Sequence, residues 1–213
     1  HGIAWFPQYV NKDAFQTLRD NYGINTIRLA MYTNKSEGYG PDAVNKVREG
    51  VKYATELGMY VIIDWHILND GNPNQHKSEA KKFFTKMSKK YGGQKNVIYE
   101  ICNEPNGNVT WNKQIKPYAK TIVKTIRKHS KNAVIVIGTP TWSQDVDVVA
   151  QSPLKGKNLM YALHFYAGTH KEWNQEKLKT AHKKGLPVMV TEFSICDASG
   201  NGALDKASGN QWL

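Results

Sequence analysis

The sequence lacks the features that mark membrane, disulfide-rich and nucleotide-binding proteins. No apolar run in it approaches the ~20 residues needed to cross a bilayer. Its two cysteines, Cys102 and Cys196, match no zinc-ligand spacing. We expect two buried free thiols, with a disulfide between them as the alternative. The chain has no Gly-x-Gly-x-x-Gly, no phosphate-binding lysine motif and no Gly-x-Ser-x-Gly, so nucleotide-binding and serine-hydrolase sites are not indicated.

Acidic residues are also scarce, since 18 Asp and Glu stand against 29 Lys and Arg, a net charge of +11. The lysines concentrate in Lys77–Lys95, Lys113–Lys131 and Lys177–Lys184, which are helical in pattern. Nucleic-acid binding favours a basic face interleaved with aromatic or loop contacts. These lysines instead indicate the solvated sides of amphipathic helices, so we expect neither a nucleic-acid nor a membrane partner. A basic surface would still favour adsorption to anionic material.

Strand-like apolar runs alternate with amphipathic helical segments, with no break in composition. Helices are predicted at Lys12–Tyr22, Pro41–Leu57, Ser78–Tyr91, Asn112–His129 and Trp173–Lys184, with another beginning within residues 204–213. Residues 1–6 are predicted as a loop. The six predicted strands are Ile24–Met31, Met59–Trp65, Val97–Ile101, Ala133–Gly138, Leu159–Phe165 and Pro187–Phe193. This pattern indicates one parallel α/β domain over residues 1–213.

The polar and aromatic residues that suggest chemistry follow the carboxyl ends of these strands. A barrel gathers consecutive strand ends around one mouth, whereas a doubly wound sheet places its site at a switch point, so the pattern favours a (β/α)8 barrel. The residues concerned are Tyr32, His66, Glu104, Trp142, His164, Tyr166 and Glu192.

Two of these residues, Glu104 and Glu192, are carboxylates at the ends of different strands. Glycoside hydrolysis needs such a pair, because one carboxyl protonates the leaving oxygen while the other attacks the anomeric carbon or activates water. Arg28 lies within an apolar strand, so we expect it to pair with a carboxylate and lower the pKa of that group. Flat rings that would pack on sugars at the same mouth belong to Trp5, Tyr32, Trp142 and Tyr166.

A rival hypothesis takes Asp64, His66, His164 and Glu104 as metal ligands. Asp64 and His66 share one face of a strand, but no closely spaced ligand motif supports the set, and we expect no metal. The remaining histidines and two tryptophans have simpler explanations. We expect His76, His129, His170 and His182 at the surface, and Trp111 and Trp173 covering the core.

Five segments resemble the bacterial endo-β-1,4-glucanases, or cellulases, of glycoside hydrolase family five. They are I-Y-E-I-C-N-E-P-N-G, V-I-I-D-W-H-I-L-N-D-G-N-P, G-T-P-T-W-S-Q-D-V-D, Y-A-L-H-F-Y-A-G-T-H and V-T-E-F. The resemblance runs nearly end to end and is strongest with Bacillus-type enzymes. It implies a secreted enzyme with no cofactor that hydrolyses internal bonds of cellulose and related β-glucans, with retention of configuration.

The resemblance also implies residue roles. Glu104, in the Asn-Glu-Pro motif, would be the acid/base, and Glu192 the nucleophile that forms the glycosyl-enzyme. Arg28 and Tyr166 would hold the nucleophile, and Asn103 would contact the sugar 2-hydroxyl. The implied subsite residues are His1, Trp5, Phe6, Tyr32 and His66 toward the non-reducing end, Trp142 on the leaving-group side and Ala198 and Ser199 in a flanking loop, with His164 beside the carboxylates.

The chain departs from this family at its two ends. Family members have a strand ending just before His1 and a Trp-rich strand after the point where this chain stops. We therefore expect a barrel truncated at both ends, with open edges at the strands beginning at Ile24 and Pro187 and a tendency to self-associate. Two alternatives stay open: a truncated glucan-binding chain with little or no activity, and a mannanase or mixed-linkage glucanase of the same family.

Overall fold

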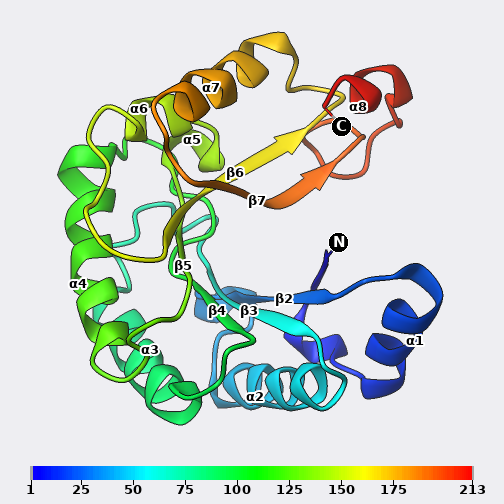
Figure 1. Cartoon of the computed structure of the whole chain (residues 1–213), viewed down its shortest axis with the longest axis vertical. Coiled ribbons are helices and arrows are strands. Elements are labelled where there is room, and N and C mark those ends of the chain that lie inside the picture. Colours follow the sequence, from blue (N-terminus) through cyan, green and yellow to red (C-terminus); the bar gives the residue numbers. More distant parts are fainter. Residues whose placement is uncertain (1, 213) are drawn as a thin grey trace.

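The computed structural model describes residues 2–212 and shows a sheet of parallel strands in sequence order, β1 to β7. The sheet curls into an open barrel with helices on its outer face (Figure 1). The predicted barrel class is therefore confirmed. The strands are β1 Gly2–Trp5, β2 Thr26–Tyr32, β3 Tyr60–His66, β4 Val97–Glu100, β5 Ile135–Ile137, β6 Leu159–Tyr166 and β7 Val188–Ser194.

The helices fill the connections between strands and cover the outside of the sheet (Figure 1). They are α1 Lys12–Tyr22, α2 Pro41–Glu56, α3 Lys77–Tyr91, α4 Lys116–Arg127, α5 Pro140–Ser143, α6 Val146–Val149, α7 Glu172–Lys183 and α8 Lys206–Trp212. Short 3-10 turns lie at Pro7–Tyr9 and Lys35–Glu37, and a π-helical turn, Trp111–Ile115, leads into α4. None of the described helices is both long enough and apolar enough to span a membrane.

Local sequence signals set several helix ends. The Asn11 side chain accepts a hydrogen bond from the Ala14 amide and caps the start of α1. Gly23 follows α1 with φ 65°, a left-handed conformation that glycine adopts without steric cost. Pro41 occupies the first turn of α2, where its missing N–H leaves no hydrogen bond unmade.

The core lies between the sheet and the helices and consists mainly of apolar side chains. Trp65, on β3, packs its ring 5.2 Å from Phe83 and 5.4 Å from Tyr39. Further fully buried residues come from β2, α2 and α4, including Ile27, Leu29, Val47, Val51, Ile122 and Ile126. Each strand thus has one face fixed by the helices, and its other face is left to line the barrel interior.

Three details of the sequence prediction were wrong. Residues 2–5 form strand β1, paired with β2, rather than a loop, because their backbone groups complete the β2 ladder. The sheet therefore has seven strands rather than six, and its edges are β1 and β7 rather than β2 and β7. Strand β4 ends at Glu100, so Glu104 lies four residues beyond it.

The two sheet edges face a cavity of about 450 Å³. Gly2 and Ile3 line it from β1, and Val190 and Phe193 line it from β7. This cavity reaches the barrel interior at Arg28 and Glu192, so the open edge lies next to the candidate site.

Candidate active site

Glu104 reaches the mouth of the barrel on a loop that stays tied to both neighbouring strands. The Ile101 amide donates to the Val136 carbonyl at 3.0 Å, and the Asn103 amide donates to the Trp65 carbonyl at 3.1 Å. Backbone hydrogen bonds to the neighbouring strands thus continue past the end of β4. They orient the segment that carries Glu104, whose side chain is buried.

Glu192 is placed by an irregularity in the pairing of β6 with β7. Leu163 pairs with Val190, but the next residue, His164, pairs with Glu192, so Thr191 is the extra residue of a β-bulge. Such bulges redirect side chains and are common beside active sites. Here the bulge sets Glu192 opposite His164 while Thr191 also turns toward the same histidine.

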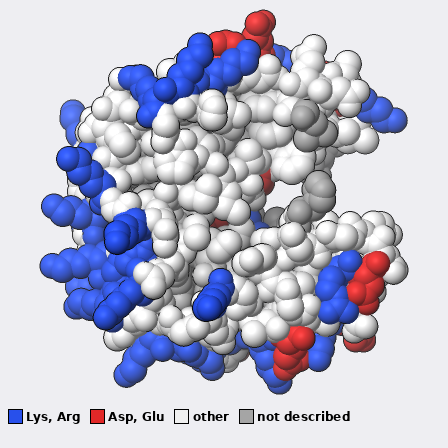
Figure 2. All heavy atoms as spheres, in the orientation of Figure 1, with Lys and Arg blue, Asp and Glu red and all other residues white. Residues whose placement is uncertain are grey.

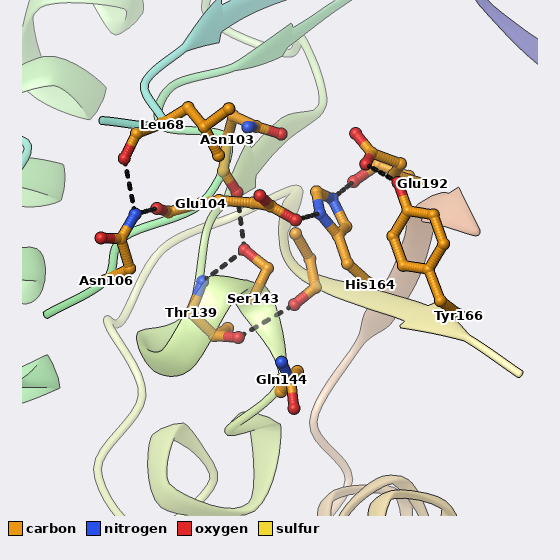
Figure 3. A network of polar contacts seen from close by, with 12 residues as sticks. Leu68, Asn103, Glu104, Asn106, Thr139, Ser143, Gln144, His164, Tyr166 and Glu192 are labelled. Carbon is orange, nitrogen blue, oxygen red and sulfur yellow. Dashed lines mark hydrogen bonds and ion pairs between the residues drawn. The ribbon is translucent and has the colours of Figure 1, made fainter. Parts of the chain in front are cut away.

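The two glutamates meet at His164. One carboxylate oxygen of Glu104, one of Glu192 and one ring nitrogen of His164 all lie within 4.8 Å of one another. Figure 3 shows the Glu104 carboxylate on one side of the imidazole and the Glu192 carboxylate on the other. Two carboxylates 88 positions apart in the chain are thereby gathered into one group.

Glu192 is held by two donors. Tyr166 Oη donates to its Oε1 at 2.6 Å, and Arg28 Nη1 donates to its Oε2 at 3.0 Å. Burial alone would raise the pKa of Glu192, but the positive charges of His164 and Arg28 outweigh it and lower this pKa to about 2. Burial and the Glu192 charge raise the pKa of Tyr166, which keeps its hydroxyl proton. Glu192 is therefore an anion at neutral pH.

Arg28 is the buried cation on which the acidic groups converge. It forms ion pairs with Asp64 at 3.0 Å, Glu100 at 2.8 Å and Glu192 at 3.0 Å. Its Nη2 also donates to Asn103 Oδ1 at 2.7 Å. The expected pairing of Arg28 with a carboxylate is present, but it involves three carboxylates rather than one.

Sequence reasoning missed Glu100, which is fully buried beneath the site. Burial would raise the pKa of Glu100, but the positive charges of Arg28 and of His164, whose Nε2 lies 3.8 Å from Glu100 Oε1, lower it to about 2. The signal was available, because Glu100 ends an apolar strand and Arg28, in another apolar strand, required a partner.

His164 carries a charge that links these groups. Its Nδ1 lies 2.9 Å from Glu104 Oε1, and its Nε2 lies 2.8 Å from Thr191 Oγ1, which in turn donates to Glu100 Oε1 at 2.8 Å. Burial would lower the pKa of His164, but Glu100 and Glu104 outweigh it and raise this pKa to about 9. The imidazolium therefore donates from both ring nitrogens at neutral pH.

An open cleft of about 790 Å³ lies above this network. Phe6 stacks on Tyr32 with 5.7 Å between ring centroids, and Tyr32 lies 4.7 Å from the His66 ring. The predicted site residues that line the cleft are Phe6, Arg28, Tyr32, His66, Glu104, Trp142, His164, Tyr166, Glu192, Ala198 and Ser199. Gln144 and His170 line it as well and were not predicted.

Three of the predicted site residues are not among those that line the cleft. Asn103 is fully buried and does not line the cleft; its side chain bonds Arg28 and donates to the Ile67 carbonyl at 3.0 Å. Trp5 belongs to β1, but its side chain lies outside the described part of the structure, as does the whole of His1.

Trp142 stands on a left-handed turn at the cleft rim. Thr141, Trp142 and Ser143 have φ values of 57°, 54° and 58°, which non-glycine residues adopt at a cost of roughly 1–2 kcal/mol each. Ser143 Oγ holds the turn by donating to the Asn103 carbonyl at 2.6 Å, and the Trp142 amide donates to the Pro105 carbonyl at 3.0 Å. The turn and the loop that carries Glu104 are therefore one hydrogen-bonded unit (Figure 3).

The rival set of metal ligands is not brought together. Asp64 Oδ2 is bonded to Arg28 and to His66 Nδ1, the latter at 2.6 Å, whereas Glu104 and His164 face Glu192. Among residues 2–212 the group near enough to ligate an ion is Glu104, His164 and Glu192.

Other side-chain predictions had mixed outcomes. Cys102 and Cys196 are buried and unpaired, and Trp111 is buried, as expected. His170 is not at the surface, because its Nδ1 accepts a hydrogen bond from the Tyr166 amide at 2.7 Å within the barrel mouth. Trp173 does not cover the core: it is 50% exposed, and its ring packs edge-on against that of His170, with 5.7 Å between the ring centroids.

A parallel barrel with paired carboxylates at the strand ends defines the class of barrel glycoside hydrolases. The model of the cellulase family, glycosyl hydrolase family 5, matches residues 1–213. An endoglucanase of Clostridium saccharobutylicum is 49% identical over all of this chain and 48% of its own length. This chain belongs to glycosyl hydrolase family 5. It spans about half the length of the curated relatives it matches.

Solved structures agree with this assignment. The cellulase Cel5C_n is 42% identical, with a TM-score of 0.92, over all of this chain and 68% of its own. An endoglucanase Cel5A of Thermobifida fusca, solved with cellotetraose, is 34% identical with a TM-score of 0.90, over all of this chain and 72% of its own.

Proposed function

We propose that this chain is a retaining endo-β-1,4-glucanase that hydrolyses internal bonds of cellulose and related β-glucans. The observation that supports it is the approach of Glu104 and Glu192 oxygens to within 4.8 Å. Retaining enzymes hold their carboxyls about 5–5.5 Å apart, whereas inverting enzymes leave about 6.5–9.5 Å for a water molecule. The observed spacing favours direct attack by one carboxylate.

Glu192 is the nucleophile of this proposal. It is anionic at neutral pH, and Arg28 and Tyr166 hold one oxygen each, so its attack on the anomeric carbon needs no prior proton loss. A covalent glycosyl-enzyme forms as the glycosidic bond breaks. The Glu192 carboxylate loses its negative charge as it becomes an ester, and Arg28 and Tyr166 remain placed to donate to its oxygens in both states.

Glu104 is the acid/base. It gives a proton to the leaving oxygen in the first step and takes one from the attacking water in the second. His164 Nδ1, at 2.9 Å, holds the carboxyl in place. Because His164 is cationic, it also limits the repulsion between Glu104 and Glu192 when both are ionised.

The substrate assignment is supported by the cleft and the relatives. Phe6, Tyr32 and Trp142 present rings to the cleft, and aromatic faces pack well on the apolar faces of sugars. Relatives with this fold are endoglucanases, one of them solved with cellotetraose. A polymer of this kind does not cross membranes, and we accordingly propose that the protein acts outside the cell.

The test is release of reducing ends from a soluble β-1,4-glucan by this 213-residue chain beside Glu192→Gln. We expect activity in the unaltered chain and loss of at least three orders of magnitude in the variant, about 4 kcal/mol of transition-state stabilisation. Glu172→Gln, which alters an exposed glutamate on α7, is the matched control and should retain activity. An inactive unaltered chain would favour the glucan-binding alternative.

Two further assays separate the remaining possibilities. Mannan and mixed-linkage glucan should be cut more slowly than β-1,4-glucan; faster cleavage of either would move the specificity to that polymer. NMR of the first product should show the β-anomer, because a double displacement retains configuration. Initial formation of the α-anomer would contradict the assignment of Glu192 as nucleophile.

We also propose that the open edges of the sheet promote pairing with a second copy of the chain. Strand edges with unpaired amides and carbonyls are sites of association, and Val190 and Phe193 on β7 are 40% and 53% exposed. Sedimentation velocity should show a concentration-dependent dimer that Val190→Lys weakens. A monomer at all concentrations would refute this.

A further inference from the structure

Positive charge is concentrated in one part of this chain. Residues 77–131 hold 14 of the 29 Lys and Arg and only 3 of the 18 Asp and Glu, so this segment alone carries a charge of +11. The rest of the chain holds 15 basic and 15 acidic residues and is neutral. Two of the three acids of the segment, Glu100 and Glu104, are buried in the barrel mouth, which leaves Glu79 as its exposed acid.

Most of these lysines belong to α3 and α4, and the rest belong to the segments next to them. The two helices are neighbours on the side of the barrel away from its open edge (Figure 1). Figure 2 shows Lys and Arg side chains spread over this side, with the Asp and Glu side chains in view lying elsewhere. We call this surface the α3–α4 face. Its exposed lysines are Lys81, Lys82, Lys86, Lys89, Lys90, Lys95, Lys113, Lys120, Lys124, Lys128 and Lys131.

The charges of the α3–α4 face are not neutralised within the described residues. Ion pairs elsewhere on the surface join Lys12 to Glu56 and Lys177 to Asp145, whereas no described ion pair includes a lysine of residues 77–131. Lys116, Lys120, Lys124 and Lys128 follow one another at intervals of four, and like charges at this spacing destabilise a helix by about 0.2–0.5 kcal/mol per pair. Helix stability therefore does not explain the arrangement.

The composition of the face points to one kind of polyanion. Its one arginine, Arg127, donates to the carbonyls of Ser130, Ala133 and Lys157, so its guanidinium is not free to form a bidentate contact with a phosphate. None of the large hydrophobic side chains that are exposed in the described structure lies within residues 77–131. The face therefore lacks rings for stacking on bases and apolar groups for entering a lipid layer.

We propose that the α3–α4 face is a second polysaccharide-binding surface, which adsorbs a carboxylated polysaccharide. Lysine ammonium groups four residues apart on a helix are separated by about 6 Å along its axis, a spacing of the order of one sugar unit. A chain with one carboxylate per sugar can therefore contact successive lysines as a string of point charges. The cleft stays open to a neutral glucan while this face is occupied, because the two surfaces share no residue.

Such adsorption would hold the protein on material in which neutral and acidic polysaccharides are mixed. The interaction is electrostatic and exposed, so it weakens steeply as salt screens it; the screening length is ~10 Å at 0.1 M. It requires neither Glu104 nor Glu192, so it can be tested apart from hydrolysis.

The test is binding of polygalacturonate by the full chain carrying Glu192→Gln, measured by affinity electrophoresis at several salt concentrations. The face variant replaces four lysines by glutamine, at Lys86, Lys89, Lys120 and Lys124. The matched control makes the same change in net charge with four exposed lysines away from this face, at Lys35, Lys52, Lys183 and Lys206. Circular dichroism and thermal unfolding establish that both variants are folded.

We expect the face variant to bind polygalacturonate on the order of tenfold more weakly, with a shallower salt dependence, and the control to bind like the parent. Equal losses in both variants would assign binding to net charge and overturn the proposal, as would no loss in either. Tighter binding of duplex DNA or of anionic lipid vesicles than of polygalacturonate, at the same salt concentration, would also overturn it in favour of that partner.

Discussion

The charge on His164 makes the stability of this fold depend on pH. Its pKa is about 9 in the folded chain, because Glu100 and Glu104 outweigh the effect of burial. The unfolded value is about 6.5. The folded state thus holds the proton more tightly than the unfolded state. His164 stabilises the fold fully below pH ~6.5, and this contribution is lost as the pH rises to ~9.

The size of the effect follows from the pKa difference. A shift of about 2.5 units at about 1.36 kcal/mol per unit corresponds to about 3 kcal/mol of unfolding free energy. This figure applies with little screening, since His164 is 1% exposed. It would be a large part of the ~5–15 kcal/mol that stabilises an ordinary domain.

The assay is urea unfolding at half-unit steps from pH 5.5 to 10, for the unaltered chain and for His164→Gln. Glutamine can hydrogen-bond but does not titrate, so the difference between the two curves isolates the imidazole. We expect this difference to fall by about 3 kcal/mol between pH ~6.5 and ~9. A difference that stays constant would refute the assignment of a charged His164.

A matched control guards against a general effect of losing a histidine. His129 is exposed just beyond α4, and His129→Gln should give a difference curve without this alkaline fall. A similar fall in both variants would mean that the pH dependence does not come from the site.

Three further predictions concern the cleft and its supports. Tyr166→Phe removes the 2.6 Å hydrogen bond to Glu192, so the pKa of Glu192 should rise and the acidic limb of the kcat/KM profile should move to higher pH; an unchanged limb would contradict this. Gly138→Ala would bring a Cβ into collision with the Cys102 carbonyl in the loop that carries Glu104, so we expect a loss of roughly 1–3 kcal/mol in stability and a fall in kcat. Gly93→Ala, where an added Cβ meets nothing within 4 Å, should be close to neutral in urea unfolding. Trp142→Ala removes a ring that is 46% exposed, so KM for soluble β-glucan should rise with little change in unfolding free energy, and an unchanged KM would exclude a substrate contact.

The sequence was informative wherever a structure depends on residues close together in the chain. The helical segments predicted at Lys12–Tyr22 and Pro41–Leu57, and the apolar runs that became β3 and β6, each match an observed element to within a few residues at its ends. For residues 2–5 the prediction was wrong. They are too few to show a period, and they become a strand by pairing with β2, which lies more than twenty residues away.

The sequence also identified the chemical groups at the mouth of the barrel. In a parallel barrel every strand delivers its carboxyl end to the same rim, so Glu104 and Glu192 could be assigned to one site without knowledge of register. The same reasoning found Arg28 and predicted that a buried guanidinium requires carboxylate partners.

Only the tertiary structure decided how these groups are connected. The bulge at Thr191 turns Glu192 toward His164, Glu100 closes the path from His164 back to Arg28, and the left-handed turn around Trp142 is fixed by the loop of Glu104. Each of these three connections depends on the register between segments that are distant in the sequence, and local periodicity carries no information about that register. Local patterns determine which residues reach the rim, whereas the curl of the sheet determines which of them touch and therefore what charge each one carries.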